Sequence, residues 1–297
     1  MVRPSKKTQI PNLQEAIKDM AWKQIAEFGA AALSLRAIAR ELKITAPAIY
    51  NYFPDRDALV TALIIDAYTS FGDYQIVSRD AQAGDDLAGR LRAIGYSYRQ
   101  WALDYPQRYQ LIFGTPIPGY KAPLMEILPS AARSLSALVS VIDELRIANK
   151  LQTENFPSIQ PGYESMFDVW RGFAGDYDIF SLSVAMIIWS RVHGLVSLEV
   201  SGNMPPFGVD GSALYRFEID SLIKQFIKNN FKGVLLCTQF LLPVYESVRF
   251  FLCRFLRITP CVRVCRLRNL KASLVSILAL RRITSFGQRP FGKKSRR

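Results

Sequence analysis

Residues 34–53 read SLRAIARELKITAPAIYNYF, and this stretch decides the fold that we expect. Its first half places apolar side chains three and four residues apart, as on one side of a helix. Ser34 can cap that helix through its hydroxyl. Lys43 and Ile44 follow as a turn, Thr45 is a second capping residue, and Pro47 suits the first turn of a new helix. The stretch therefore predicts two short helices joined by a tight turn, a helix-turn-helix unit.

The second helix of this unit has one apolar side and one small, polar side. Ile49 and Phe53 lie four residues apart and can pack on the first helix. On the other side, Ala48 can touch a thymine methyl group and Asn51 can pair with adenine in a major groove. Alternatively, the unit is a helical hairpin in an ordinary all-α protein. We expect the remaining DNA contacts, largely to phosphates, from Ser34, Arg36, Lys43, Thr45, Ala46, Pro47, Tyr50, Tyr52 and Arg56.

These residues carry a resemblance to a known family. Residues 44–53, ITAPAIYNYF, followed by Arg56-Asp57-Ala58-Leu59, resemble the DNA-binding signature of the TetR family of transcription regulators. Residues 12–29, with apolar positions at helical spacing, fit the helix that precedes this signature. One departure is Lys43, where the family usually has glycine. A left-handed backbone costs a residue with a β-carbon about 1 kcal/mol, so we expect a slightly different turn.

The net charge of +13 is unevenly distributed along the 297 residues. Residues 231–297 hold 15 of the 38 lysines and arginines but only one of the 25 acidic residues, Glu246. The first 230 residues hold 23 basic and 24 acidic residues, so their net charge is −1. The overall charge is therefore no evidence that the helix-turn-helix unit binds DNA.

Residues 229–297 form an atypical basic tail that follows no TetR pattern. All four cysteines lie there, namely Cys237, Cys253, Cys261 and Cys265. Three interpretations are open: a translated non-native extension, which we favour, a basic arm for DNA or an anionic membrane, and a metal site. The spacing of Cys261 and Cys265 lacks a second close Cys or His pair, which argues against zinc. We expect no metal and no cofactor.

The N-terminal residues 1–9 are basic and polar, with no apolar run behind them. We interpret them as a flexible basic arm, with a disordered solvated end as the alternative. No signal peptide is visible, and no segment of about 20 uninterrupted apolar residues exists. We therefore expect a cytoplasmic protein without a stable membrane span.

Residues 57–228 are predicted to be helical throughout, and strand alternation is absent. We expect a helix-turn-helix domain at residues 10–56 and a bundle for ligand binding and dimerisation at 57–228, an all-α architecture. The predicted helices cover residues 57–71, 85–105, 107–113, 129–150, 177–200 and 212–228, with a region containing Pro and Gly at 156–176.

The segment Trp189-Ser190-Arg191-Val192-His193-Gly194 resembles the Trp-His-Gly type of TetR C-terminal domain. An aromatic lining for a small lipophilic effector is one interpretation of the bundle, and an ordinary aromatic core is the other. His193, the only histidine, is expected to be a hydrogen-bonded core group rather than a ligand or a base. The predicted lining is Trp101, Tyr105, Tyr109, Phe113, Met125, Trp170, Trp189 and His193.

The last predicted helix places Leu214, Phe217, Leu222 and Phe226 on one side. Paired with residues 177–200 it can form a four-helix interface across a two-fold axis, although the same faces can close the core of a monomer. A two-fold homodimer would read a palindromic operator in double-stranded DNA.

The sequence thus predicts a ligand-responsive transcription regulator, most often a repressor in the resembling family. The rivals are a protein that acts through its basic tail on membranes or nucleic acid, and an enzyme, for which no catalytic motif is found.

Overall fold

The computed structural model describes residues 11–154, 156–205 and 211–228. The predicted N-terminal arm and the basic tail with its four cysteines lie outside the described residues. Within the described ranges every regular element is a helix, and the only β-pairing is an isolated antiparallel bridge between Leu151 and Ile227. The predicted all-α architecture is confirmed.

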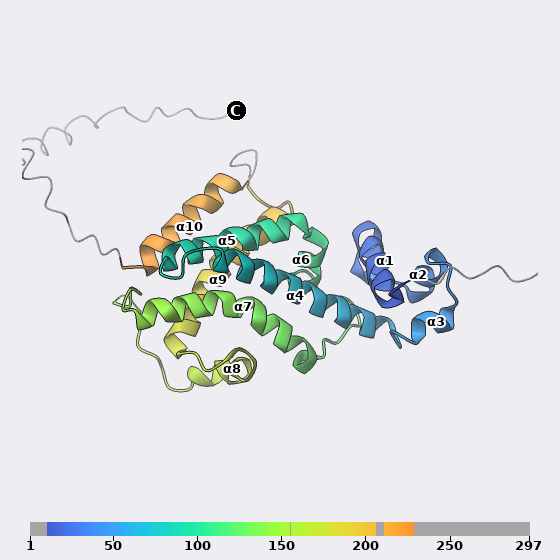
Figure 1. Cartoon of the computed structure of the whole chain (residues 1–297), viewed down its shortest axis with the longest axis horizontal. Coiled ribbons are helices and arrows are strands. Elements are labelled where there is room, and N and C mark those ends of the chain that lie inside the picture. The colour runs from blue at the N-terminus through green and yellow to red at the C-terminus, as the bar shows by residue number, and fades with distance from the viewer. Residues whose placement is uncertain (1–10, 155, 206–210, 229–297) are drawn as a thin grey trace, which may run out of the picture. The chain divides into compact units, whose positions relative to one another are not determined.

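The N-terminal part consists of three helices around one apolar cluster, with a short 3-10 turn between the first two (Figure 1). Asn12, Ser34 and Asp55 cap α1, α2 and α4 through their side chains, as short polar residues before a helix commonly do. The elements are α1 (Leu13–Phe28), η1 (Ala30–Ala32), α2 (Leu35–Glu41) and α3 (Ala46–Tyr50), followed by the long α4 (Arg56–Asp80).

Helix α4 continues well beyond residue 71, where the sequence suggested its end. Gly72 does not terminate it, because this glycine serves a close helix contact instead. A β-carbon at Gly72 would lie 3.1 Å from Ser134 Cα and 3.2 Å from Ser134 N, on the facing helix. Glycine therefore lets the two backbones approach.

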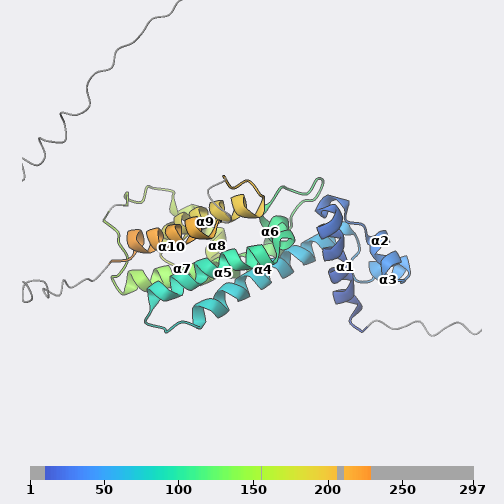
Figure 2. The same cartoon turned by 90° about the horizontal axis from the view of Figure 1, so that it is seen from above.

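The bundle beyond α4 contains six more α-helices (Figures 1 and 2). One predicted helix start is wrong, because the helix expected to begin at Pro129 begins five residues earlier and contains that proline. The region with Pro and Gly, for which no helix bounds were predicted, contains a short helix, α8. The elements are α5 (Leu87–Asp104), α6 (Pro106–Phe113), α7 (Leu124–Ile147), η2 (Glu164–Phe167), α8 (Asp168–Ala174), α9 (Ile179–Val200) and α10 (Ser212–Phe226).

Two apolar clusters meet along α4. Its first turns contribute Leu59 and Leu63 to the N-terminal cluster, and its later turns contribute Ala67 and Phe71 to the bundle core. The single continuous helix α4 therefore joins both clusters. The domain boundary expected between residues 56 and 57 stays a prediction.

Helices α7 and α9 are long and apolar enough to span a membrane by length and composition alone. Both also supply fully buried residues to the bundle core, such as Val139 and Ile142 from α7 and Val184 and Val196 from α9. The apolar character of α7 and α9 is therefore explained by their packing in the bundle core.

Candidate functional site

Helix α3 is held in place by apolar residues on its inner side. Ile49 and Phe53 are 0% and 4% exposed and pack with Ile17, Ile38 and Leu59 from three other helices. The predicted inward positions of Ile49 and Phe53 are confirmed. The helix is short, so its orientation depends on this packing rather than on its own hydrogen bonds.

The turn between α2 and α3 has a left-handed residue at Lys43, with φ of 54°. Its N–H donates to Arg40 O at 3.1 Å, and the Ile44 N–H donates to Ala39 O at 3.0 Å. The expectation that lysine changes the turn is therefore wrong: Lys43 adopts the conformation that favours glycine and bears its steric cost.

The outer face of α3 is exposed and uncharged. Tyr50 and Tyr52 are 41% and 45% exposed, and Ala48 is half-buried at the edge of this face. Thr45 precedes the helix as expected, but its hydroxyl makes no capping hydrogen bond, so the predicted side-chain cap is wrong. The exposed predicted contact residues around this face are Arg36, Lys43, Thr45, Ala46, Pro47, Tyr50, Asn51 and Tyr52.

Two predicted phosphate ligands have roles inside the chain. Arg56 donates from Nη2 to Ala30 O at 3.1 Å and to Ala31 O at 3.2 Å, so it fastens the start of α4 to η1. These two bonds occupy Nη2 only, and the phosphate contact of Arg56 stays a prediction. Ser34 Oγ accepts from Ala37 N at 3.3 Å, a bond that does not use its hydroxyl proton, and its phosphate contact stays a prediction.

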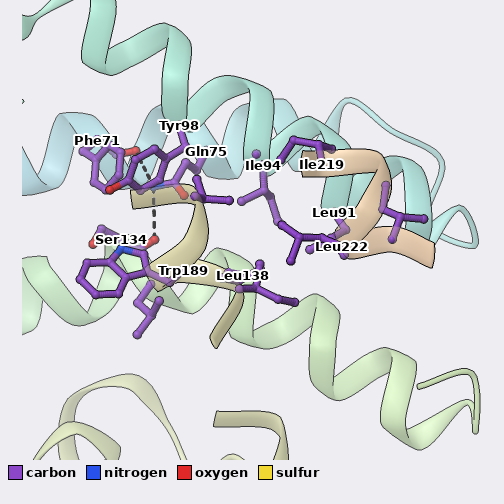
Figure 3. A pocket seen from close by; sticks show the side chains of 15 residues that line it. Phe71, Gln75, Leu91, Ile94, Tyr98, Ser134, Leu138, Trp189, Ile219 and Leu222 are labelled. Carbon is purple, nitrogen blue, oxygen red and sulfur yellow. Dashed lines mark hydrogen bonds between the residues drawn. The ribbon is translucent and has the colours of Figure 1, made fainter. Parts of the chain in front are cut away.

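The bundle encloses a central cavity between α4, α5, α7, α9 and α10 (Figure 3). Its volume is about 40 Å³, room for a few water molecules and far below the size of a typical ligand pocket. Aliphatic side chains supply most of the wall. The lining is Phe71, Gln75, Leu91, Ile94, Gly95, Tyr98, Ser134, Leu135, Leu138, Ile188, Trp189, Val192, Ile219, Leu222 and Ile223.

Of the predicted aromatic lining, only Trp189 reaches this cavity. Met125 and Tyr105 are 65% and 40% exposed on the surface. Trp101 is fully buried and donates from Nε1 to Ser70 Oγ at 3.0 Å. Trp170 on α8 packs beside Tyr177. These four residues do not line the central cavity, and the effector contacts expected of them stay a prediction.

Tyr109, Phe113 and His193 form a second group beside the cavity, between α6 and α9. His193 Nδ1 lies 2.9 Å from Tyr98 Oη and 3.0 Å from Tyr109 Oη, and its ring stacks on Trp189 at 4.7 Å. Burial lowers the pKa of His193, which favours the neutral imidazole. The two tyrosine hydroxyls suit an accepting Nδ1. His193 is hydrogen-bonded as predicted, although it is half-buried rather than fully buried.

Gln75 is the polar residue of the cavity that the sequence did not reveal. Its Nε2 donates to Phe71 O at 3.2 Å and to Ser134 O at 3.3 Å, drawn as dashed lines in Figure 3. Its amide oxygen has no hydrogen-bond partner in the described part of the chain. A buried glutamine three residues past Gly72 would have been the signal, had the helix been extended past residue 71.

Among the described residues, no group of three His, Cys, Asp or Glu side chains is placed to hold a metal ion. The arrangement therefore consists of a short helix, α3, with an exposed outer face, a small apolar cavity, and one helix, α4, that contributes to the core beneath α3 and to the cavity wall.

Comparison with known proteins assigns this arrangement to a family. The HTH-type transcriptional regulator Rv1816 of Mycobacterium tuberculosis is 33% identical over 201 residues, which cover 67% of this chain and 83% of that protein. The family model for "Bacterial regulatory proteins, tetR family" matches residues 17–63 and that for "Tetracyclin repressor-like, C-terminal domain" matches residues 91–222. The chain belongs to the TetR family. It is thus a DNA-binding transcription regulator.

Two solved structures agree with the fold. The crystal structure of the regulatory protein SCO4313 has a TM-score of 0.57 and 37% identity, covering 72% of this chain and all of that one. A SmeT–triclosan complex has a TM-score of 0.52 at 15% identity, covering 74% of this chain and 94% of that one, and supports the fold alone. Neither family model reaches the basic tail.

Proposed function

We propose that this TetR regulator is a cytoplasmic homodimeric repressor that reads a palindromic operator and releases it when a small lipophilic effector enters the central cavity. The observation that carries the proposal is the continuity of α4. Arg56 and Leu59 belong to the reading unit, whereas Phe71 and Gln75 line the cavity. About 28 Å of unbroken helix separates Arg56 from Gln75.

A dimer is supported by the exposed apolar residues of α9 and α10, which pack against each other (Figure 2). Phe217 is 72% exposed, and Ile187 and Leu198 are 39% and 40% exposed. Gly194 lies on the same side of α9, and a β-carbon there would meet nothing within 4 Å. Leu222 and Phe226 are buried in the core, whereas Phe217 is exposed, so these residues do not share one side of α10 as predicted.

The effector class follows from the wall of the cavity. Aliphatic residues and Trp189 favour an apolar molecule, and the free amide oxygen of Gln75 favours a hydrogen-bond donor on it. SmeT, which shares the fold, has been crystallised with triclosan. A molecule of that kind needs more than the present 40 Å³, so it must displace side chains as it binds.

Selection of bound DNA from a random pool, with the full chain, tests the reading function directly. We expect an inverted repeat whose half-sites are about one helical turn or a multiple of it apart. Tyr50→Ala and Asn51→Ala should weaken binding to the selected site, and Tyr74→Ala, an exposed tyrosine on α4, should not. Equal binding by all three variants would reject the reading face, and selection of a single unrepeated site would reject the dimer.

Effector response needs its own measurement. Operator affinity should fall when a neutral aromatic alcohol is added, and Gln75→Leu should weaken this response while preserving DNA affinity without effector. Gln82→Leu is the control, because Gln82 is exposed on the surface and does not line the cavity. If operator affinity depends on no apolar compound, the chain is a constitutive DNA binder.

A further inference from the structure

A second and larger hollow lies at the junction of the reading unit and the bundle. One wall is the end of α1 with η1, including Ile25 and Ala31, and the other is α6 with the loop that follows it. We call it the junction groove. Its volume is about 430 Å³, within the range of small-molecule sites and about ten times that of the central cavity.

The described lining of the junction groove contains no charged side chain. Ile25, Leu111 and Ile117 give it an apolar floor. Gln107 and Gln110 lie on the groove face of α6, and neither carboxamide makes a side-chain hydrogen bond within the described residues. Each carboxamide can both donate and accept. An ion would lose hydration there without gaining a counter-charge, which makes its binding unfavourable. A neutral molecule with one polar edge avoids this cost.

The walls of the groove are held by contacts outside it. Arg56 binds the carbonyl oxygens of Ala30 and Ala31. Arg108 on α6 lies over the Trp22 ring of α1, with its guanidinium carbon 5.2 Å from the ring centroid. The hollow is thus framed by fixed elements, which suits binding without a large ordering cost.

We propose that the junction groove is a second small-molecule site, separate from the central cavity, for an uncharged molecule with an apolar body and a polar group that donates or accepts hydrogen bonds. Such a molecule contacts η1, and Arg56 at the start of α4 donates to the carbonyl oxygens of η1. Occupancy therefore stabilises the present position of the reading unit against α6. This last consequence rests on the proposed DNA-reading function, whereas the binding itself does not.

Two fluorescent probes with the same ring system test the site on the full chain without DNA. N-phenylnaphthylamine is neutral and anilinonaphthalene sulfonate is an anion. We expect the neutral probe to bind the groove more tightly. Hydrogen–deuterium exchange should show protection at residues 25–31 and 107–118 when it binds. Protection confined to the helices around the central cavity would overturn the proposal.

Matched variants separate the two hollows. Gln110→Glu changes shape little but puts a charge in the groove, and should weaken the neutral probe about tenfold. Gln82→Glu, an exposed glutamine elsewhere, should not. Ala31→Phe should block the groove, and Ile223→Phe should fill the central cavity and leave groove binding intact. Unchanged probe affinity in both Gln110→Glu and Ala31→Phe would refute the site. Failure of DNA selection would refute only the reading function.

Discussion

Replacing Lys43 by glycine should make the protein more stable, although it removes a side chain. Lys43 has φ of 54° and an exposed side chain, and no hydrogen bond or ion pair of that side chain occurs in the described part of the chain. A left-handed backbone costs an L-residue about 1–2 kcal/mol. Glycine loses about 0.5–1 kcal/mol more conformational entropy on folding. The net gain in the free energy of unfolding is therefore between 0 and about 1.5 kcal/mol, with a midpoint of about 0.75 kcal/mol.

Thermal unfolding measures this gain. For a folded part of this size a gain of 1 kcal/mol raises Tm by about 2–4 °C, so Lys43→Gly should raise it by about 2 °C. Lys43→Ala is the matched control, because it removes the same charge and keeps the β-carbon in the left-handed region. Its stability should stay within about 0.5 kcal/mol of the parent. If Lys43→Gly is no more stable than Lys43→Ala, the reasoning from backbone strain is refuted.

The same two variants test the predicted phosphate contact. Each should reduce the slope of log binding constant against log salt concentration by about one for each protomer, because one phosphate contact is lost. An unchanged slope in both would leave Lys43 as a turn residue only. Stability and salt dependence thus separate the two roles of one side chain.

Three further changes test the bundle. Gly72→Val should lower the free energy of unfolding by about 1–3 kcal/mol, because its side chain meets the Ser134 backbone; in denaturant titrations Gly172→Val, with open space around its glycine, should cost less. The free energy of unfolding should fall as pH drops through 6.5, because the pKa of His193 is lowered in the folded state and the unfolded chain then binds more protons. His193→Gln should remove this part of the pH dependence, and an identical pH profile in the variant would contradict it. Phe217→Lys should weaken the dimer about tenfold or more in sedimentation, whereas Val77→Lys on α4 should not; equal masses for both variants would argue against the α9–α10 interface.

The reading unit could be predicted from the sequence because its determinants are local. The Ser34 cap, the apolar spacing of α2 and the inward positions of Ile49 and Phe53 all lie within twenty residues, and the structure confirms each. The turn at Lys43 was predicted less well. Intrinsic backbone preferences give the free-energy cost of a left-handed lysine. The packing of α2 against α3 nevertheless fixes Lys43 in that conformation.

The cavity could not be predicted in the same way, because residues far apart in sequence build it. Gly72 looks like a helix end until Ser134 of α7 is known to lie against it. Tyr98 and His193 are 95 positions apart and still share a hydrogen bond. Of the aromatic residues that stand out in the sequence, Tyr109 and Phe113 pack with His193 beside the cavity, while mainly aliphatic residues from five helices enclose it.

Both walls of the cavity are tied by buried hydrogen bonds, so an effector would make room by moving side chains. On one side, α4 and α7 approach at Gly72, and Gln75 Nε2 donates to Ser134 O. On the other side, Ile219 Cδ1 fills the notch at Gly95, and Tyr215 of α10 donates to Gly95 O of α5. Neither wall can retreat without breaking a buried hydrogen bond. Ile219 and the exposed Phe217 both belong to α10. If α10 forms part of the dimer interface, an effector that displaces Ile219 would act on the spacing of the two reading units through the interface as well as through α4.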